Sequence, residues 1–147
     1  MHLTHRQRTV LIGVLEDQRR LANMPLDGHV GSRLDRGRHR ITVRNARDGL
    51  VPMNLAGWLD HAPTNSEHVL FHREYLRLEG MGLLERVGLT GGRRTTHLRL
   101  TPTGRRVAED LLAEEYGLDG EDDIDWSNVE FEPIEIPMNS AGGESSG

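Results

Sequence analysis

The stretch of residues 65–105 constrains the fold more than any other part of this sequence, because it contains clear signals first for a helix and then for two strands. No proline or glycine occurs from Ser66 to Leu78, and apolar residues recur there at the spacing of one helix face. Gly80 and Gly82 follow directly, where a helix C-terminus is expected. The buried face of this predicted helix consists of Phe71, Tyr75 and Leu78.

The second half of the same stretch predicts a β-hairpin and the start of another helix. Residues 83–87 favour an extended segment, and the glycines within 88–92 favour a turn. Apolar and polar residues then alternate over 96–101, which is typical of a half-buried strand. Thr101 is a suitable helix cap and Pro102 suits a first helical turn, so we expect a helix to follow the hairpin.

This order of elements, together with the segments RLEGMGLLERV and LRLTPTGRRVAEDLL, resembles the winged helix-turn-helix of bacterial regulators of the MarR and PadR type. In that family, an RLE run followed by GL and ER ends the recognition helix, and an LTP.GR run closes the wing. The resemblance covers roughly residues 52–112 and implies a mainly α fold with a small β wing. The matching residues are Arg77, Leu78, Glu79, Gly82, Leu83, Leu84, Glu85 and Arg86, then Leu100, Thr101, Pro102, Gly104 and Arg105.

Charge is distributed very unevenly along the chain. Residues 1–112 contain all 18 arginines and 12 carboxylates, a net charge of +6, and the chain has no lysine. Residues 113–147 contain 11 carboxylates and no basic residue. A basic body with an acidic tail is the asymmetry expected of a domain that binds polyanions. A biased genomic base composition would explain the use of arginine in place of lysine, but not the separation of the two signs.

Composition excludes several classes of protein. The sequence contains no cysteine, which excludes disulfides and thiolate metal sites. No apolar run is long enough to span a membrane, and the N-terminus lacks the apolar core of a signal peptide, so we expect a cytoplasmic protein. We find no nucleophile–base pair and no phosphate-binding glycine loop, and we therefore expect neither catalysis nor a cofactor.

Two helices are predicted before the recognition helix. Residues 4–23 show an apolar face and begin with Thr4 as a possible cap. In the resembled family this helix packs under the recognition helix or extends into a dimer interface, and the sequence does not separate these two roles. Residues 52–60 predict a short second helix with Pro52 in its first turn, and Asn65 or Ser66 is expected to cap the third.

Residues 24–51 form an arginine-rich insertion relative to the resembled family. Ile41 and Val43 alternate with polar residues, which predicts a short strand with one arginine-bearing face. Such arginines could contact the phosphates of nucleic acid. The alternative is a solvated loop whose arginines pair with the carboxylates of the chain itself. The candidate phosphate contacts in the insertion are Arg38, Arg40 and Arg44.

The outward face of the predicted third helix carries Val69, His72, Arg73 and Leu76, if each residue turns the helix by about 100°. In the resembled family this face enters the major groove of DNA. Arg73 could bond to guanine or to phosphate, and His72 could donate to either. Val69 and Leu76 fit a thymine methyl group, but they also fit a contact with protein or with the 24–51 insertion.

Two patterns invite a metal site, and we predict none at either. His68 and His72 lie four residues apart on the third helix, but no third ligand is specified. The acidic residues of 119–130 follow the spacing of a calcium loop, but Ile124 occupies the position that requires glycine. Pro133 also discourages the helix that should follow such a loop.

The sequence therefore predicts a winged-helix domain over residues 1–116 and an acidic, partly disordered tail over 117–147. Acidic and apolar residues alternate in the tail, which is typical of a segment that binds a protein or the basic body of the same chain. We expect a homodimeric regulator of transcription that binds double-stranded DNA. The alternative is a winged-helix module for protein–protein interaction. The candidate DNA contacts are His68, Val69, His72, Arg73, Arg93, Arg94, Arg38, Arg40 and Arg44.

Overall fold

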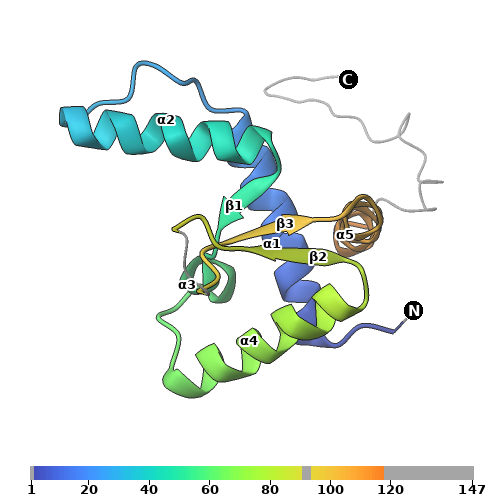
Figure 1. The fold of residues 1–147 in the computed structure, drawn as a ribbon. Helices are drawn as coiled ribbons and strands as arrows, with labels where there is room; N and C mark the ends of the chain where they lie inside the picture. The colour runs from blue at the N-terminus through green and yellow to red at the C-terminus, as the bar shows by residue number, and fades with distance from the viewer. Residues whose placement is uncertain (1, 91–93, 118–147) are drawn as a thin grey trace, which may run out of the picture. The chain divides into compact units, whose positions relative to one another are not determined.

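The structure is a computed structural model, which describes residues 2–90 and 94–117. The described residues form mainly helices and a small three-stranded antiparallel sheet (Figure 1). This α+β arrangement is compatible with a winged helix. In chain order the elements are α1 (His5–Ala22), α2 (Arg33–Arg47), β1 (Leu50–Pro52), α3 (Leu55–Leu59), α4 (Asn65–Gly80), β2 (Leu84–Val87), β3 (His97–Leu100) and α5 (Pro102–Glu115).

The sheet has the strand order β1-β3-β2, so that β3 is its central strand. The β2–β3 hairpin was predicted from the sequence, and its register pairs Leu84 with Leu100. Strand β1 was not predicted. It pairs Val51 with Leu98, and both of these side chains are fully buried. Burial of this pair explains why a segment of only three residues joins the sheet.

The core lies where α1 and α4 meet the sheet. Helix α1 buries four consecutive members of its apolar face, and α4 buries the three residues predicted for it. Helix α5 approaches the backbone of Leu83 closely at Gly104. A Cβ atom at position 104 would clash with the carbonyl oxygen of Leu83. Glycine is therefore required at this crossing. The buried side chains of α1 and α4 in this core are Val10, Leu11, Val14, Leu15, Phe71, Tyr75 and Leu78.

Helix α3 is held against α1 by a carboxylate. Asp17 accepts hydrogen bonds from Nδ2 of Asn54 at 3.1 Å and from Nε1 of Trp58 at 2.9 Å. Gly13 leaves room for the indole, since a Cβ atom there would lie only 2.5 Å from the ring. These contacts set the position of α3 before the turn into α4. The left-handed conformation of Asp60 (φ 63°) then ends α3.

Two boundary predictions were wrong. Pro52 lies at the end of β1 and not in the first turn of a helix, because β1 is an edge strand, where proline is tolerated. Helix α4 is capped by Thr64, whose Oγ1 accepts from the backbone of Glu67, and not by Asn65 or Ser66. The Glu67 side chain returns a hydrogen bond to the backbone N–H of Thr64, which completes a capping box.

The strand predicted around Ile41 and Val43 was also wrong, because these residues lie within helix α2. Ser32 and Asp35 form a capping box at its start. Val43 and Ala46, one helical turn apart, are fully buried, and α2 packs on α1 and β1. This packing outweighs the alternation that suggested a strand.

No helix in the described ranges has the length and apolar character needed to cross a membrane.

Candidate nucleic-acid interface

The outward face of α4 is exposed as predicted. Val69 and Leu76 keep 52% and 43% of their surface exposed, so the described residues of the insertion do not cover them. Figure 1 shows α2 and α4 on opposite sides of the sheet, which agrees with this exposure. Ser66, Val69, Arg73 and Leu76 follow one another at intervals of three, four and three residues. They form one row along α4, which we call the outer row.

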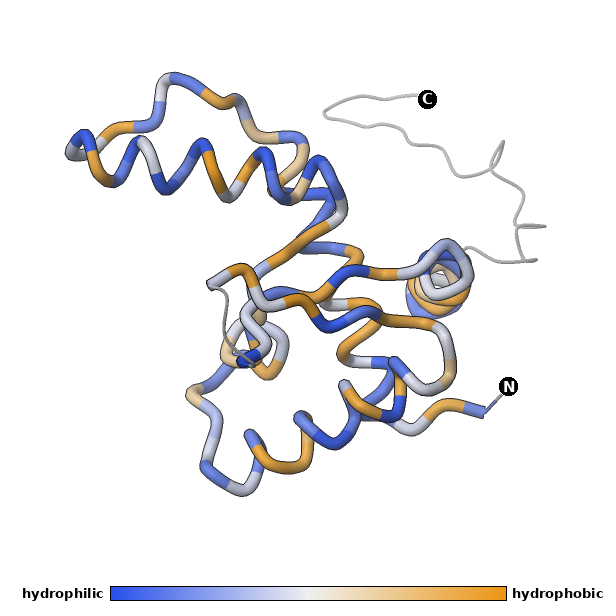
Figure 2. The backbone as a smooth tube through the Cα atoms, in the orientation of Figure 1, coloured by the Kyte–Doolittle hydropathy of each residue, from blue (hydrophilic) through white to orange (hydrophobic). Residues whose placement is uncertain are grey.

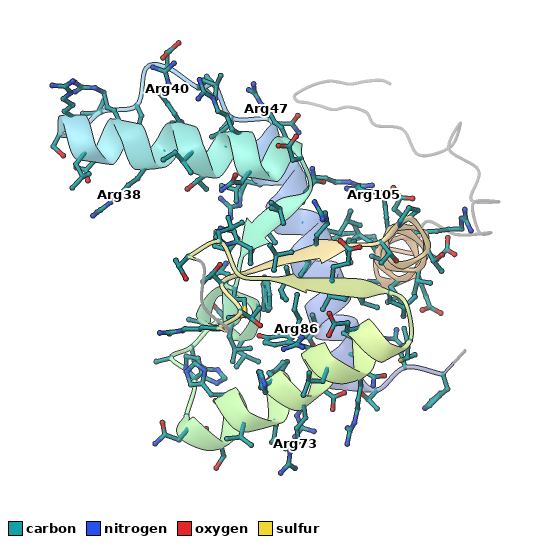
Figure 3. The ribbon with its side chains drawn as sticks, in the orientation of Figure 1. Arg38, Arg40, Arg47, Arg73, Arg86 and Arg105 are labelled. Carbon is teal, nitrogen blue, oxygen red and sulfur yellow. The ribbon has the colours of Figure 1, made fainter. Side chains whose placement is uncertain are left out.

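Arg73 is the charged member of the outer row. Its side chain projects from α4 away from the sheet (Figure 3), and it has no hydrogen-bond or ion-pair partner among the described residues. A guanidinium group in this position keeps its donors available for an acceptor outside the molecule. Ser66 was not singled out in the sequence, although its spacing of three residues from Val69 indicates the same row.

The carboxylates of α4 are engaged within the protein. Glu74 is 5% exposed and accepts hydrogen bonds from Nε2 of Gln7 and from Nη1 of Arg77, each at 3.0 Å. Gln7 belongs to α1 and also closes the capping box of that helix. This network therefore ties the middle of α4 to the start of α1, and it keeps the charge of Glu74 away from the outer row.

The carboxylates of Glu67 and Glu79 also accept hydrogen bonds from within the protein. The backbone N–H of Thr64, and then the side chain of His61, hold the pKa of Glu67 below its ordinary value. The hydrogen bond from Nε of Arg86 at 2.8 Å does the same for the pKa of Glu79. Arg86 lies between α4 and the sheet in Figure 3. The outer row itself contains no carboxylate, so its charge comes from Arg73 alone.

A hollow of about 500 Å³ lies between α3, α4 and the segment that precedes β3. His68 and His72 line it from α4, and Arg94 lines it from the segment between β2 and β3. Burial raises the pKa of Tyr75, which also lines the hollow, to about 12, so its hydroxyl stays protonated at neutral pH. Met53 completes one wall and was not foreseen from the sequence.

The residues that line the hollow show on which side of α4 the predicted histidines lie. His68 and His72 point to the side of α4 that faces α3, beside the outer row and not on it. His72 stacks edge-on against Tyr75, with ring centroids 6.4 Å apart. Within the described ranges, no group of three or more possible ligands could hold a metal ion at these histidines or elsewhere. Together with Arg94, these side chains offer nitrogen donors to an anion that enters the hollow.

The β2–β3 hairpin is braced at both ends. Near its base, Glu85 and Arg99 face each other across the two strands and form an ion pair at 2.8 Å. Oγ1 of Thr96 accepts a hydrogen bond from the backbone N–H of Leu89 at 3.0 Å. Arg94 is exposed and has no partner in the described part of the chain. Arg93, which was also predicted to contact DNA, lies outside the described residues.

The predicted contacts on the insertion form a separate group. Arg38, Arg40 and Arg44 all belong to α2, and the structure does not bring them together with Arg73 of α4 (Figure 3). Arg40 forms an ion pair with Asp27 at 3.3 Å. The alternative prediction, a solvated loop whose arginines pair with the carboxylates of the chain, had the wrong secondary structure, because these arginines lie on a helix. Arg38 and Arg44 are exposed, and neither has a partner among the described residues.

No protein-family model, curated protein or solved structure matches this chain significantly.

Proposed function

We propose that this protein is a winged-helix DNA-binding regulator of transcription that acts without catalysis in the cytoplasm. The order of helices and strands supports the proposal, as does the resemblance to regulators of the MarR and PadR type. In this proposal α4 enters the major groove of duplex DNA, and the wing arginines reach backbone phosphates. Two copies would bind two half-sites about 34–36 Å apart, the spacing of one helical turn of DNA.

The observation that carries the proposal is the chemical character of the outer row of α4. Every carboxylate of α4 is engaged within the protein, while Arg73 presents its guanidinium group outward. A helix that enters a groove lined by phosphates must avoid uncompensated negative charge, since phosphate attraction supplies much of the affinity. Arg94 and the two histidines line the hollow between α3 and α4, and they add further hydrogen-bond donors to that of Arg73. Arg38, Arg40 and Arg44 are not required by this proposal.

The test is the salt dependence of binding to duplex DNA of mixed sequence, measured with the full chain. The amide-tail variant, in which the carboxylates of residues 119–135 become amides, removes any competition by the acidic tail. Replacing Arg73 or Arg94 by alanine should weaken binding. Each loss of a phosphate contact should also lower the slope of log affinity against log salt concentration by about 0.9.

Arg19→Ala is the matched control, because it removes the same charge from α1 and not from α4. Arg19 forms an ion pair with Glu109 at 2.9 Å. Its salt slope should equal that of the parent chain. If all three variants lose affinity equally, only net charge matters and the proposed interface is wrong.

The exposure of Val69 and Leu76 favours a second candidate function, a winged-helix module that binds protein through the outer row. Under this alternative, the amide-tail variant does not bind duplex DNA even at low salt. Measurable DNA binding that depends on Arg73 but persists in Val69→Ser would count against it.

A further inference from the structure

Helix α2 has two sides that differ in their contacts. On the side that faces the preceding loop, the arginines are engaged with the chain itself. Nη1 of Arg36 donates to the carbonyl oxygen of Gly31 at 2.9 Å, and Arg40 forms its ion pair with Asp27. Nη2 of Arg47 donates to the carbonyl oxygen of Met24 in this loop at 2.9 Å. Figure 3 shows Arg40 and Arg47 on this loop side.

The opposite side of α2 lacks such contacts. Leu34, Arg38 and Ile41 succeed one another at intervals of four and three residues, so they share one face, and Arg44, three residues after Ile41, lies beside it. We call these four residues the outer face of α2. Figure 3 shows Arg38 on this side, away from the loop. Within the described part of the chain, neither of its two arginines has a hydrogen-bond or ion-pair partner.

The outer face also exposes two large apolar side chains. Leu34 and Ile41 keep 62% and 59% of their surface exposed, and they are about 10 Å apart along the helix axis. They do not anchor α2, because Val43 and Ala46 bury the other side of its C-terminal half. In Figure 2 most of α2 is hydrophilic, with hydrophobic residues only at separated positions. Leu34 and Ile41 are therefore not part of the hydrophobic core of the described domain.

Three kinds of occupant can be compared for this face. A nucleic acid backbone would satisfy the arginines but offers no apolar surface to Leu34 and Ile41. The same face of a second copy would match the apolar pair, but it would bring two guanidinium groups against two others. An acidic peptide that also carries apolar side chains satisfies both requirements at once. Charge complementarity and the apolar pair together favour the peptide.

We propose that the outer face of α2 is a docking surface for an acidic peptide segment of a partner protein. The segment places apolar side chains over Leu34 and Ile41, and its carboxylates pair with Arg38 and Arg44. This surface lies on a different element from the outer row of α4. The proposal therefore stands or falls independently of DNA binding.

A synthetic peptide with the sequence of residues 119–136 is a suitable probe, because it combines eight carboxylates with interspersed apolar residues. The peptide is titrated into the full-length amide-tail variant, so that the chain's own carboxylates do not compete. Fluorescence anisotropy gives its affinity, and amide hydrogen exchange shows where it binds. Protection is expected in α2.

The double variant Leu34→Ser, Ile41→Ser should bind the peptide at least about tenfold more weakly, because it removes both apolar contacts. Arg38→Gln, Arg44→Gln should weaken binding about tenfold and flatten its salt dependence. The matched control is Arg36→Gln, Arg40→Gln, which removes the same charge from the loop side and should stay within about twofold. All six substituted positions are exposed, and circular dichroism verifies that each variant folds.

Three results would overturn the proposal. The first is equal binding to the outer-face and loop-side variants, or no binding at all. The second is that a peptide with all its apolar residues changed to serine binds equally well, or that duplex DNA displaces the peptide and depends on Arg38 but not on Leu34. Either outcome would assign the face to simple polyanion binding. The third is much weaker binding to the wild-type chain than to the amide-tail variant, which would assign the occupant to the chain's own carboxylates and not to a partner.

Discussion

Replacement of Glu74 by alanine should destabilise the fold far more than replacement of its ion-pair partner. Glu74 is buried, and its carboxylate accepts from the buried amide of Gln7 as well as from Arg77. Glu74→Ala removes a hydrogen bond to a charged acceptor and leaves the Gln7 amide without an acceptor. These are two aspects of one lost interaction, which costs about 1–3 kcal/mol. Because both side chains are buried, a loss near the upper end, about 3 kcal/mol, is expected.

Arg77→Ala removes only the exposed member of the network. The Arg77 side chain is 61% exposed, and an ion pair with one solvated partner contributes about 1 kcal/mol or less. The carboxylate of Glu74 keeps its hydrogen bond from Gln7 in this variant. Glu74→Gln should fall between the two alanine variants, because it retains an acceptor for the Gln7 amide but loses the charge.

Urea and thermal unfolding of the full chain measure these differences. For a domain of this size, a loss of about 3 kcal/mol should lower the melting temperature by roughly 10–15 °C. The reasoning fails if Glu74→Ala costs less than about 1 kcal/mol, or if Arg77→Ala is equally costly. Either result would mean that Gln7 finds water or another acceptor, and that the link between α1 and α4 is not held by this carboxylate.

Gly104→Ala should prevent stable folding, because its Cβ atom would overlap the carbonyl oxygen of Leu83, and backbone cannot move aside as a flexible side chain can. Expression and circular dichroism would check this, and a soluble variant with unchanged unfolding would contradict the packing of α5. Glu79→Gln should alter the acid sensitivity of the protein. The hydrogen bond from Arg86 lowers the folded-state pKa of Glu79 below its ordinary 4.5, so its stabilisation is present above the unfolded pKa and is lost as pH falls through the folded value. Urea unfolding between neutral and acidic pH should therefore show a smaller loss of stability in Glu79→Gln than in the parent, and identical pH profiles would refute the assignment.

The amphipathic face of α4 could be predicted from the sequence, because helix periodicity is a local property. Phe71, Tyr75 and Leu78 are buried as expected, and Val69 and Leu76 are exposed. The engagement of the α4 carboxylates could not be predicted in the same way. Glu74 meets Gln7 across a separation of 67 residues, and nothing in the local pattern around either residue indicates the other.

Helix α2 illustrates a local signal that was misread. The alternation around Ile41 is too short to distinguish a strand from a helix, whereas Ser32 and Asp35 have the three-residue spacing of a capping box. The sequence could not show which arginines of α2 have partners on the preceding loop. That division depends on the loop that folds back over one side of the helix and provides carbonyl and carboxylate acceptors there.

The sequence by itself determined α4, the β2–β3 hairpin, the start of α5 and the separation of positive from negative charge. These features depend on residues within a few positions of one another, whose spacing, capping and turn preferences act locally. The tertiary structure alone decided that Val51 joins the sheet beside Leu98 and that Glu74 is buried against α1. It also decided that the arginines of α2 and α4 lie on separate surfaces. These outcomes depend on pairings between distant segments, which form only when the shared core brings those segments into contact.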